Sequence, residues 1–181
     1  NLAAREEAGT PNVVGDIRAA LCLLVKEAMG AAFLRDRQEE LRQRALRGWA
    51  DLDNLHILGN PEAQDRLPIF SFQLRDPHTG ELVHQQLFTR MLSDIYGVQA
   101  RGGCACAGPY AHRLLGIDQQ QSDQMRAAIL AGQEIEKPGW TRLNFSALLS
   151  DEKADAIIQA VRALALDPGR YSAGYSVDTA T

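Results

Sequence analysis

The sequence predicts an α+β fold in which a small sheet has helices packed on one face. Two observations support this prediction. Residues 11–52 show only helical periodicity, whereas short strand-like segments alternate with helical ones from residue 55 onward. The 181 residues are enough for one ordinary domain with a single core and some peripheral elements.

Two helices are expected first. Thr10 can cap free backbone N–H groups, and Pro11 at the first helical position loses no hydrogen bond, so a helix is expected from there to about Met29. Gly30 interrupts the pattern, and a second helix is expected over residues 31–52. The charged face of the second helix is expected to be solvated. Its narrow inner stripe consists of Leu34, Leu41, Ala45 and Trp49.

Strands and helices then alternate. In residues 68–74 apolar and polar side chains alternate, which predicts a strand with Phe70, Phe72 and Leu74 on the core. Three further strands are expected at residues 55–58, 98–101 and 140–145. Helices are expected at residues 83–96 with Leu87, Met91 and Ile95 on one side, at 110–115, at 122–133 with Ser122 as cap, and after Ser150.

The bulk composition excludes several classes of protein. The formal net charge of −4 gives no reason to expect nucleic acid or an anionic membrane as partner. No apolar run approaches the ~20 residues that span a bilayer, and no signal peptide is visible. The three cysteines, Cys22, Cys104 and Cys106, do not describe a secreted disulfide framework, so we expect a cytoplasmic protein.

Residues 101–109 carry the most chemical information, because three glycines, two cysteines and one arginine directly follow an expected strand. Glycines let the backbone approach a ligand closely, and a cysteine beside a cation in such a loop can be a reactive thiolate. A tight turn with two packed cysteines explains the segment equally well. Cys104 and Cys106 have no nearby third ligand, and the four histidines are scattered, so no metal site is expected.

Arg142 is the second unusual residue, since it lies in an otherwise apolar strand between Thr141 and Asn144. Its planar guanidinium is suited to bidentate recognition of a carboxylate. The alternative is an arginine at the strand edge that reaches into solvent, and the residues alone leave both interpretations open.

Three short segments form an ordered set along the chain. Residues 7–12 read Glu-Ala-Gly-Thr-Pro-Asn, residues 97–109 contain Arg-Gly-Gly-Cys-Ala-Cys-Ala-Gly-Pro after a Gly-Val, and residues 142–145 read Arg-Leu-Asn-Phe. The set resembles the Glu-Ala-Gly-Thr-Pro-Asn segment, the Gly-Ile-x-x-Arg-x-Gly-x-x-Cys-Ala-x-Pro loop and the Arg-x-Ser-Phe strand of class V aminotransferases and cysteine desulfurases, including the selenocysteine lyase-like ones. The motifs keep the family order and cover nearly the whole chain.

This resemblance implies the C-terminal small domain of the PLP-dependent transferases of fold type I, with a small, mostly antiparallel sheet. It also implies a division of the chain. Residues 1–30 would contribute a helix to the large PLP domain, residues 31–166 would form the small C-terminal domain, and residues 167–181 would be a loosely held tail. Partners would be a small amino-acid substrate, the protein's own N-terminal PLP domain and a second copy in a homodimer.

The resemblance further implies site residues. Cys106 matches the desulfurase nucleophile, Arg142 matches the arginine that binds the substrate α-carboxylate, and Arg101 is a nearby second cation. Thr10 matches the threonine that reaches the PLP phosphate of the neighbouring subunit. In that chemistry PLP is the electron sink, and the thiolate attacks the substrate sulfur to leave a persulfide.

The chain departs from the family pattern in two places and lacks one group. Cys104 and Ala105 stand where the desulfurase loop of this type has two histidines, and the connection over residues 118–140 is longer than usual. None of the three lysines lies in a matching motif, so the covalent PLP lysine is expected upstream of Asn1. PLP would therefore belong to the intact protein, with none bound covalently to this chain, which we expect to be inactive alone.

Two alternatives stay open. The first is a class V aminotransferase, lyase or epimerase in which Cys106 is only structural. The second is a non-catalytic interaction module, such as a domain for docking a sulfur acceptor or for dimerisation.

Overall fold

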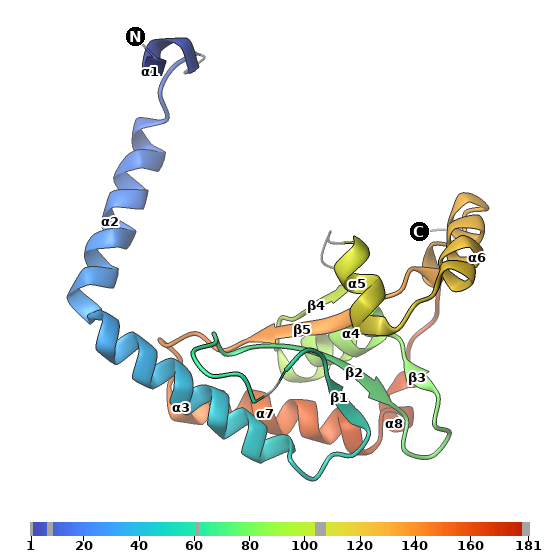
Figure 1. Cartoon of the computed structure of the whole chain (residues 1–181). Coiled ribbons are helices and arrows are strands. Elements are labelled where there is room, and N and C mark those ends of the chain that lie inside the picture. The colour runs from blue at the N-terminus through green and yellow to red at the C-terminus, as the bar shows by residue number, and fades with distance from the viewer. Residues whose placement is uncertain (1, 7–8, 61, 104–107, 179–181) are drawn as a thin grey trace. The chain divides into compact units, whose positions relative to one another are not determined.

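The computed structural model describes residues 2–6, 9–60, 62–103 and 108–178 (Figure 1). Residues 1–37 and 38–181 form two compact units, which are described separately. The helices are α1 (Leu2–Glu6), α2 (Val13–Met29), α3 (Ala31–Trp49), α4 (Gln85–Tyr96), α5 (Gly108–Leu115), α6 (Gln119–Leu130), the 3-10 helix η1 (Glu134–Glu136), α7 (Asp151–Leu166) and α8 (Gly169–Ser172). The strands are β1 (Leu55–Ile57), β2 (Ile69–Arg75), β3 (Leu82–Val83), β4 (Arg101–Gly103) and β5 (Trp140–Asn144).

In the first unit, α2 begins at Val13, two residues later than a Thr10 cap predicts. Asn12 is the N-cap, and its Oδ1 accepts the N–H of Gly15 at 3.0 Å. The prediction of a Thr10 cap was wrong because Asn, one of the strongest N-capping residues, lies two positions further on. Gly30 ends α2 at a φ of 80°, which favours glycine.

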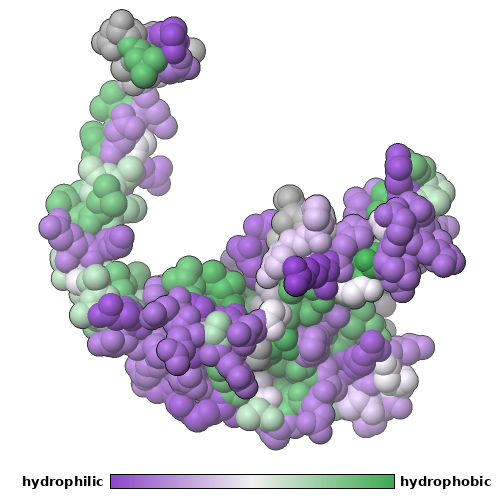
Figure 2. Space-filling model, in the orientation of Figure 1, coloured by the Kyte–Doolittle hydropathy of each residue, from purple (hydrophilic) through white to green (hydrophobic). Residues whose placement is uncertain are grey.

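No residue of α2 is buried, and its apolar side chains are exposed (Figure 2). The exposed large apolar residues of α2 are Val13, Val14, Ile17, Leu21, Leu23, Leu24 and Val25.

Among the described residues, every helix is too short or too polar to span a membrane.

The second unit is built on a five-stranded sheet in the order β1-β2-β5-β4, with β3 paired to β2. Every described pairing is antiparallel. Ser71 of β2 lies opposite Arg142 of β5, which in turn lies opposite Arg101 of β4. The predicted small antiparallel sheet with packed helices is therefore confirmed.

The core lies between one face of this sheet and helices α3, α4 and α7 (Figure 1). Phe70, Phe72 and Leu74 are buried there, as the alternation in residues 68–74 predicts. Trp49 of α3 meets Phe70 edge to face with ring centroids 5.1 Å apart. The predicted inner stripe of α3 is also buried at Leu41 and Ala45.

The buried face of α4 differs from the prediction. Met91 is fully buried as expected, but Ile95 is 40% exposed and Phe88 takes its place in the core. A stripe at positions 88, 91 and 92 fits helical spacing as well as the predicted one, so spacing alone could not choose between the two faces.

Two further boundaries correct the predictions. Strand β4 corresponds to the strand expected at residues 98–101, but it begins three residues later, at Arg101, and includes Gly102 and Gly103. Helix α6 begins at Gln119 under a capping box in which Asp118 and Gln121 bond each other's backbone N–H, so Ser122 is not its cap. Ser150 does cap α7 as predicted, with Oγ accepting the N–H of Lys153 at 3.4 Å.

The opposite face of the sheet is covered only in part. Leu58, Ala111 of α5 and Trp140 of β5 form a small second apolar cluster there. Arg142 and Asn144 lie on the same face of β5 as Trp140, because side chains two apart along a strand share a face, and both are exposed. This open face is where polar residues of β4 and β5 meet.

The C-terminal segment contains α8, and Tyr171 and Tyr175 pack against the core. The hydroxyl of Tyr175 donates to Oδ2 of Asp94 at 3.4 Å. That residues 167–181 form a loosely held tail stays a prediction. The expected domain boundaries at residues 30 and 166 also stay predictions.

Candidate functional site

Arg101 and Arg142 lie directly opposite each other on the open face of the sheet. Like charges at such positions repel, and cross-strand neighbours are close enough for the repulsion to be felt. Neither guanidinium has an acidic partner among the described residues. Two adjacent cations without an internal counterion are arranged to receive an anion.

A pocket of about 320 Å³ opens at this pair of arginines. No acidic residue is found among the described residues that line it, so its charge is positive. Its other groups are amides and a hydroxyl, which can hydrogen-bond a bound ligand. The lining consists of Ser93, Gln99, Ala100, Arg101, Arg142 and Asn144.

Two glycines allow β4 to lie where it brings Arg101 opposite Arg142. A Cβ on Gly102 would stand 2.7 Å from the carbonyl oxygen of Gln85, the first residue of α4. A Cβ on Gly139 would stand 2.7 Å from the Cα of Gly103 and 3.0 Å from Nε2 of Gln85. Gln85 is buried and donates through Nε2 to the carbonyl oxygen of Lys137 at 3.3 Å. The backbones of α4, β4 and the segment before β5 thus meet in contact.

Of the predicted site residues, the second unit brings Arg101 and Arg142 together. Cys106, together with Cys104, lies outside the described residues. Thr10 is exposed in a bend before α2, in the first unit. No group of three or more His, Cys, Asp or Glu side chains is placed to hold a metal ion within the part of the chain that the structure describes.

Gln99, Asn144 and Gln85 were not predicted as site residues, although Gln99 and Asn144 line the arginine pocket and Gln85 lies beneath β4. Asn144 could have been found, because it follows Arg142 by two residues and so shares its face of the strand. Gln99 and Gln85 carried no signal, since their places depend on where β4 meets α4 and β5.

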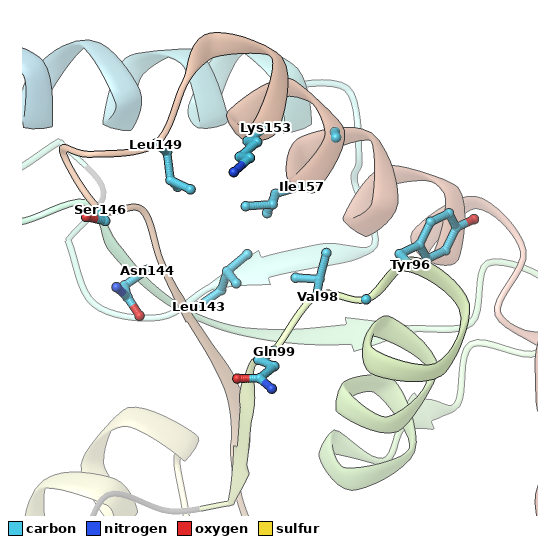
Figure 3. A pocket seen from close by; sticks show the side chains of 11 residues that line it. Tyr96, Val98, Gln99, Leu143, Asn144, Ser146, Leu149, Lys153 and Ile157 are labelled. Atoms are coloured by element: carbon cyan, nitrogen blue, oxygen red, sulfur yellow. The ribbon is translucent and has the colours of Figure 1, made fainter.

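A second pocket of about 440 Å³ lies between α7, the end of β5 and the chain after α4 (Figure 3). Figure 3 shows Leu149, Lys153 and Ile157 on the α7 side, facing Leu143 and Val98. Gln99 and Asn144 line this pocket as well as the arginine pocket.

Comparisons with known proteins agree with the fold and with the ordered motifs. The family model for aminotransferase class-V matches residues 1–136. A probable cysteine desulfurase of Vibrio cholerae is 31% identical over 103 residues, which are 57% of this chain and 23% of that protein.

Two solved cysteine desulfurases share the fold. The apo structure of the enzyme from Thermococcus onnurineus gives a TM-score of 0.65 at 23% identity and covers 89% of this chain and 33% of its own. CsdA of Escherichia coli gives 0.54 at 24% identity, with 87% and 31% covered. The chain therefore spans about a quarter to a third of the length of these relatives. The match over residues 1–136 shows that the chain belongs to the aminotransferase class-V family, as the ordered motifs predict.

Proposed function

We propose that this chain is the C-terminal part of a PLP-dependent class V enzyme of the cysteine desulfurase or selenocysteine lyase kind. The observation that supports this most is the pairing of Arg101 with Arg142 in a pocket without acidic lining among the described residues. An α-carboxylate is the anion that every amino-acid substrate carries, and a guanidinium binds it with two parallel hydrogen bonds.

In this proposal Arg142 holds the substrate α-carboxylate and Arg101 adds a second positive charge. Both side chains stand on paired strands, so they are held before the substrate arrives. Asn144 and Gln99 line the same pocket and can donate amide hydrogen bonds to the ligand.

Cys106 supplies the nucleophile. PLP, when bound to the intact protein, draws electron density from the substrate carbon. The Cys106 thiolate attacks the substrate sulfur, the carbon–sulfur bond breaks with its electron pair left on the carbon side, and a persulfide remains on Cys106. Cys106 lies outside the described residues, so its role as nucleophile is proposed from the ordered motifs.

The residues of this chain fit the substrate better than the cofactor. Lys153 lines the second pocket and Lys137 is paired with Glu134, so neither lines the arginine pocket as a covalent anchor for PLP would. Lys26 lies on α2 and outside the three motifs. We assign that anchor to the rest of the protein and expect the chain alone to be inactive. Thr10 is assigned to the PLP phosphate of a neighbouring subunit in a cytoplasmic homodimer.

One observation favours a second candidate function. Cys104 and Ala105 replace the two histidines that precede the cysteine in the desulfurase loop. A class V aminotransferase, lyase or epimerase with a structural Cys106 would keep the same arginine pocket and need no histidines there.

The carboxylate role is tested in the full-length protein by the KM for its amino-acid substrate. Replacing Arg142 by Gln should raise KM about 10- to 100-fold, which corresponds to losing a charge-assisted hydrogen bond of about 1.5–3 kcal/mol. Arg126→Gln on α6, away from the pocket lining, is the matched control and should leave KM unchanged. An unchanged KM in Arg142→Gln would contradict the proposal.

A further inference from the structure

His84 caps helix α4 with an imidazole ring, where most helices have a hydroxyl, an amide or a carboxylate. Its Nδ1 accepts the N–H of Gln86 at 3.3 Å, and its Nε2 lies 3.2 Å from the carbonyl oxygen of Ile135 in η1. A backbone N–H can only donate and a carbonyl oxygen can only accept, so Nδ1 has no proton and Nε2 carries one. The two bonds together therefore require His84 to be neutral.

The residue after this cap supports strand β4. Gln85 donates through Nε2 to the carbonyl oxygen of Lys137 at 3.3 Å, which ties the first turn of α4 to the segment before β5. A Cβ on Gly102 would stand 2.7 Å from the carbonyl oxygen of Gln85, so β4 rests on the backbone of the same turn. Arg101, which faces Arg142, is the neighbouring residue of β4. The position of the arginine pair therefore depends on how well the first turn of α4 is held.

A proton on His84 would change the cap and leave the rest of the ring's contacts in place. Histidine is the side chain that changes charge between about pH 8 and pH 5. A proton on Nδ1 turns this acceptor into a donor, so the N–H of Gln86 loses its partner, whereas Nε2 can still donate to Ile135. The positive charge is also unfavourable at a helix N-terminus, where the helix dipole is positive. Both effects weaken the first turn of α4 in acid.

Titratable groups of η1, α4 and the C-terminal segment lie near His84. Carboxylates among them would attract the charged ring, and Arg90 would repel it. The outcome at Nδ1 is the same in either case, because a protonated nitrogen cannot accept the N–H of Gln86. The groups are Glu134 and Glu136 on either side of Ile135 in η1, and Arg90, Tyr175 and Asp178, which line a pocket of about 370 Å³ together with His84.

We propose that His84 is a pH-sensitive cap that holds α4 and β4 in place when it is neutral and loosens them in acid. When the ring gains its proton, the first turn of α4 frays, β4 loses its support, and Arg101 is no longer held opposite Arg142. The inference concerns the fold around the arginine pair and holds for any anion that the pair binds.

Hydrogen exchange followed by mass spectrometry on the full-length protein tests the cap at about pH 8 and about pH 5.5. The rates are expressed as protection relative to an unstructured peptide at the same pH. Protection of residues 86–89 should fall about fivefold at the lower pH, the size expected for losing an N-cap. Residues 101–103 should lose protection in parallel, whereas helix α7 should keep its protection and is the internal reference.

Two variants separate the cap from other effects of acid. His84→Asn keeps a strong N-capping side chain that does not titrate, so its first turn of α4 should be protected equally at both pH values. His78→Asn is the matched control, because it removes another imidazole at an exposed position in the turn before β3. This control should keep the fall in protection seen in the wild type.

Unchanged protection of residues 86–89 in the wild type at about pH 5.5 would overturn the inference. An equal fall in the wild type and in His84→Asn would also overturn it, because the acid sensitivity would then belong to other groups. Loss of protection in residues 86–89 without loss in residues 101–103 would contradict the link from the cap to β4. None of these outcomes bears on PLP or sulfide release, which decide the proposed function separately.

Discussion

Gly102 lies so close to Gln85 that a Cβ on the glycine would stand 2.7 Å from the carbonyl oxygen of Gln85. A backbone oxygen at that distance cannot yield without movement of α4 or β4. The contact therefore fixes the three-residue strand β4, and with it the position of Arg101 opposite Arg142.

Replacing Gly102 by Ala should destabilise the protein by about 1–3 kcal/mol, because overpacking forces the backbone to shift. Urea unfolding followed by circular dichroism measures the loss. Gly108→Ala is the control, since no atom of the described residues outside its own helix backbone lies within 4 Å of a Cβ there and its φ is not in the left-handed region. Equal stability of Gly102→Ala and the wild type would show that β4 is not held by this contact.

Gly48 of α3 makes a second close contact, with Ile158 of α7. A Cβ on Gly48 would stand 2.4 Å from Cγ2 of Ile158. Gly48→Ala would gain about 1 kcal/mol of helix propensity, but the clash should reverse the sign and leave a net loss. In a double-mutant cycle, Gly48→Ala should cost less in an Ile158→Ala background. Additive effects in that cycle would contradict the contact.

Stability should fall in acid between about pH 4.5 and pH 2. The hydrogen bond from the Arg42 guanidinium lowers the pKa of Glu39 to about 2, and the hydrogen bond from Arg162 lowers the pKa of Asp51 to about 2. A carboxyl group whose pKa is lower in the folded than in the unfolded protein stabilises the fold above its unfolded pKa. That contribution is lost as the pH falls through the folded value.

The melting temperature measured from pH 6 to pH 2 checks this expectation. Glu39→Gln and Asp51→Asn should each flatten the profile in that window and leave its shape above pH 5 unchanged. A decline of the same steepness in both variants would assign the acid sensitivity to other groups.

The exposed apolar side chains of α2 should make the isolated chain self-associate, because surfaces of that kind usually find a partner. Light scattering coupled to size exclusion measures the mass. Leu21→Glu with Leu24→Glu should shift the chain toward monomer, whereas Arg18→Glu should not. A strictly monomeric wild type would contradict this expectation.

The sequence predicted the parts of the fold that repeat with a local period. The alternation around Phe70 and Phe72 specified β2 because one face of that strand is buried and the other is not. The three ordered motifs placed Arg142 on a strand and predicted the fold and the family.

Features that depend on distant contacts were missed. Two glycines in a row suggested a loop at residues 102–103, but pairing with β5 and the contact with Gln85 make them part of β4. The end of the ladder between β4 and β5 at Arg101 and Arg142 could not be predicted either, because it depends on where one strand ends before its neighbour. The start of α2 was misplaced for a local reason, since Pro11 favoured a helix start under Thr10 although Asn12 is the stronger capping residue.

The most direct measurement of the central claim is cysteine-dependent sulfide release by the full-length protein, with its PLP absorbance recorded in parallel and Cys106→Ala alongside. We predict bound PLP, sulfide release by the wild type and none by Cys106→Ala. PLP without sulfide in the wild type would contradict the desulfurase proposal and favour an aminotransferase, lyase or epimerase. Absence of PLP would contradict any PLP-dependent role and leave an interaction module.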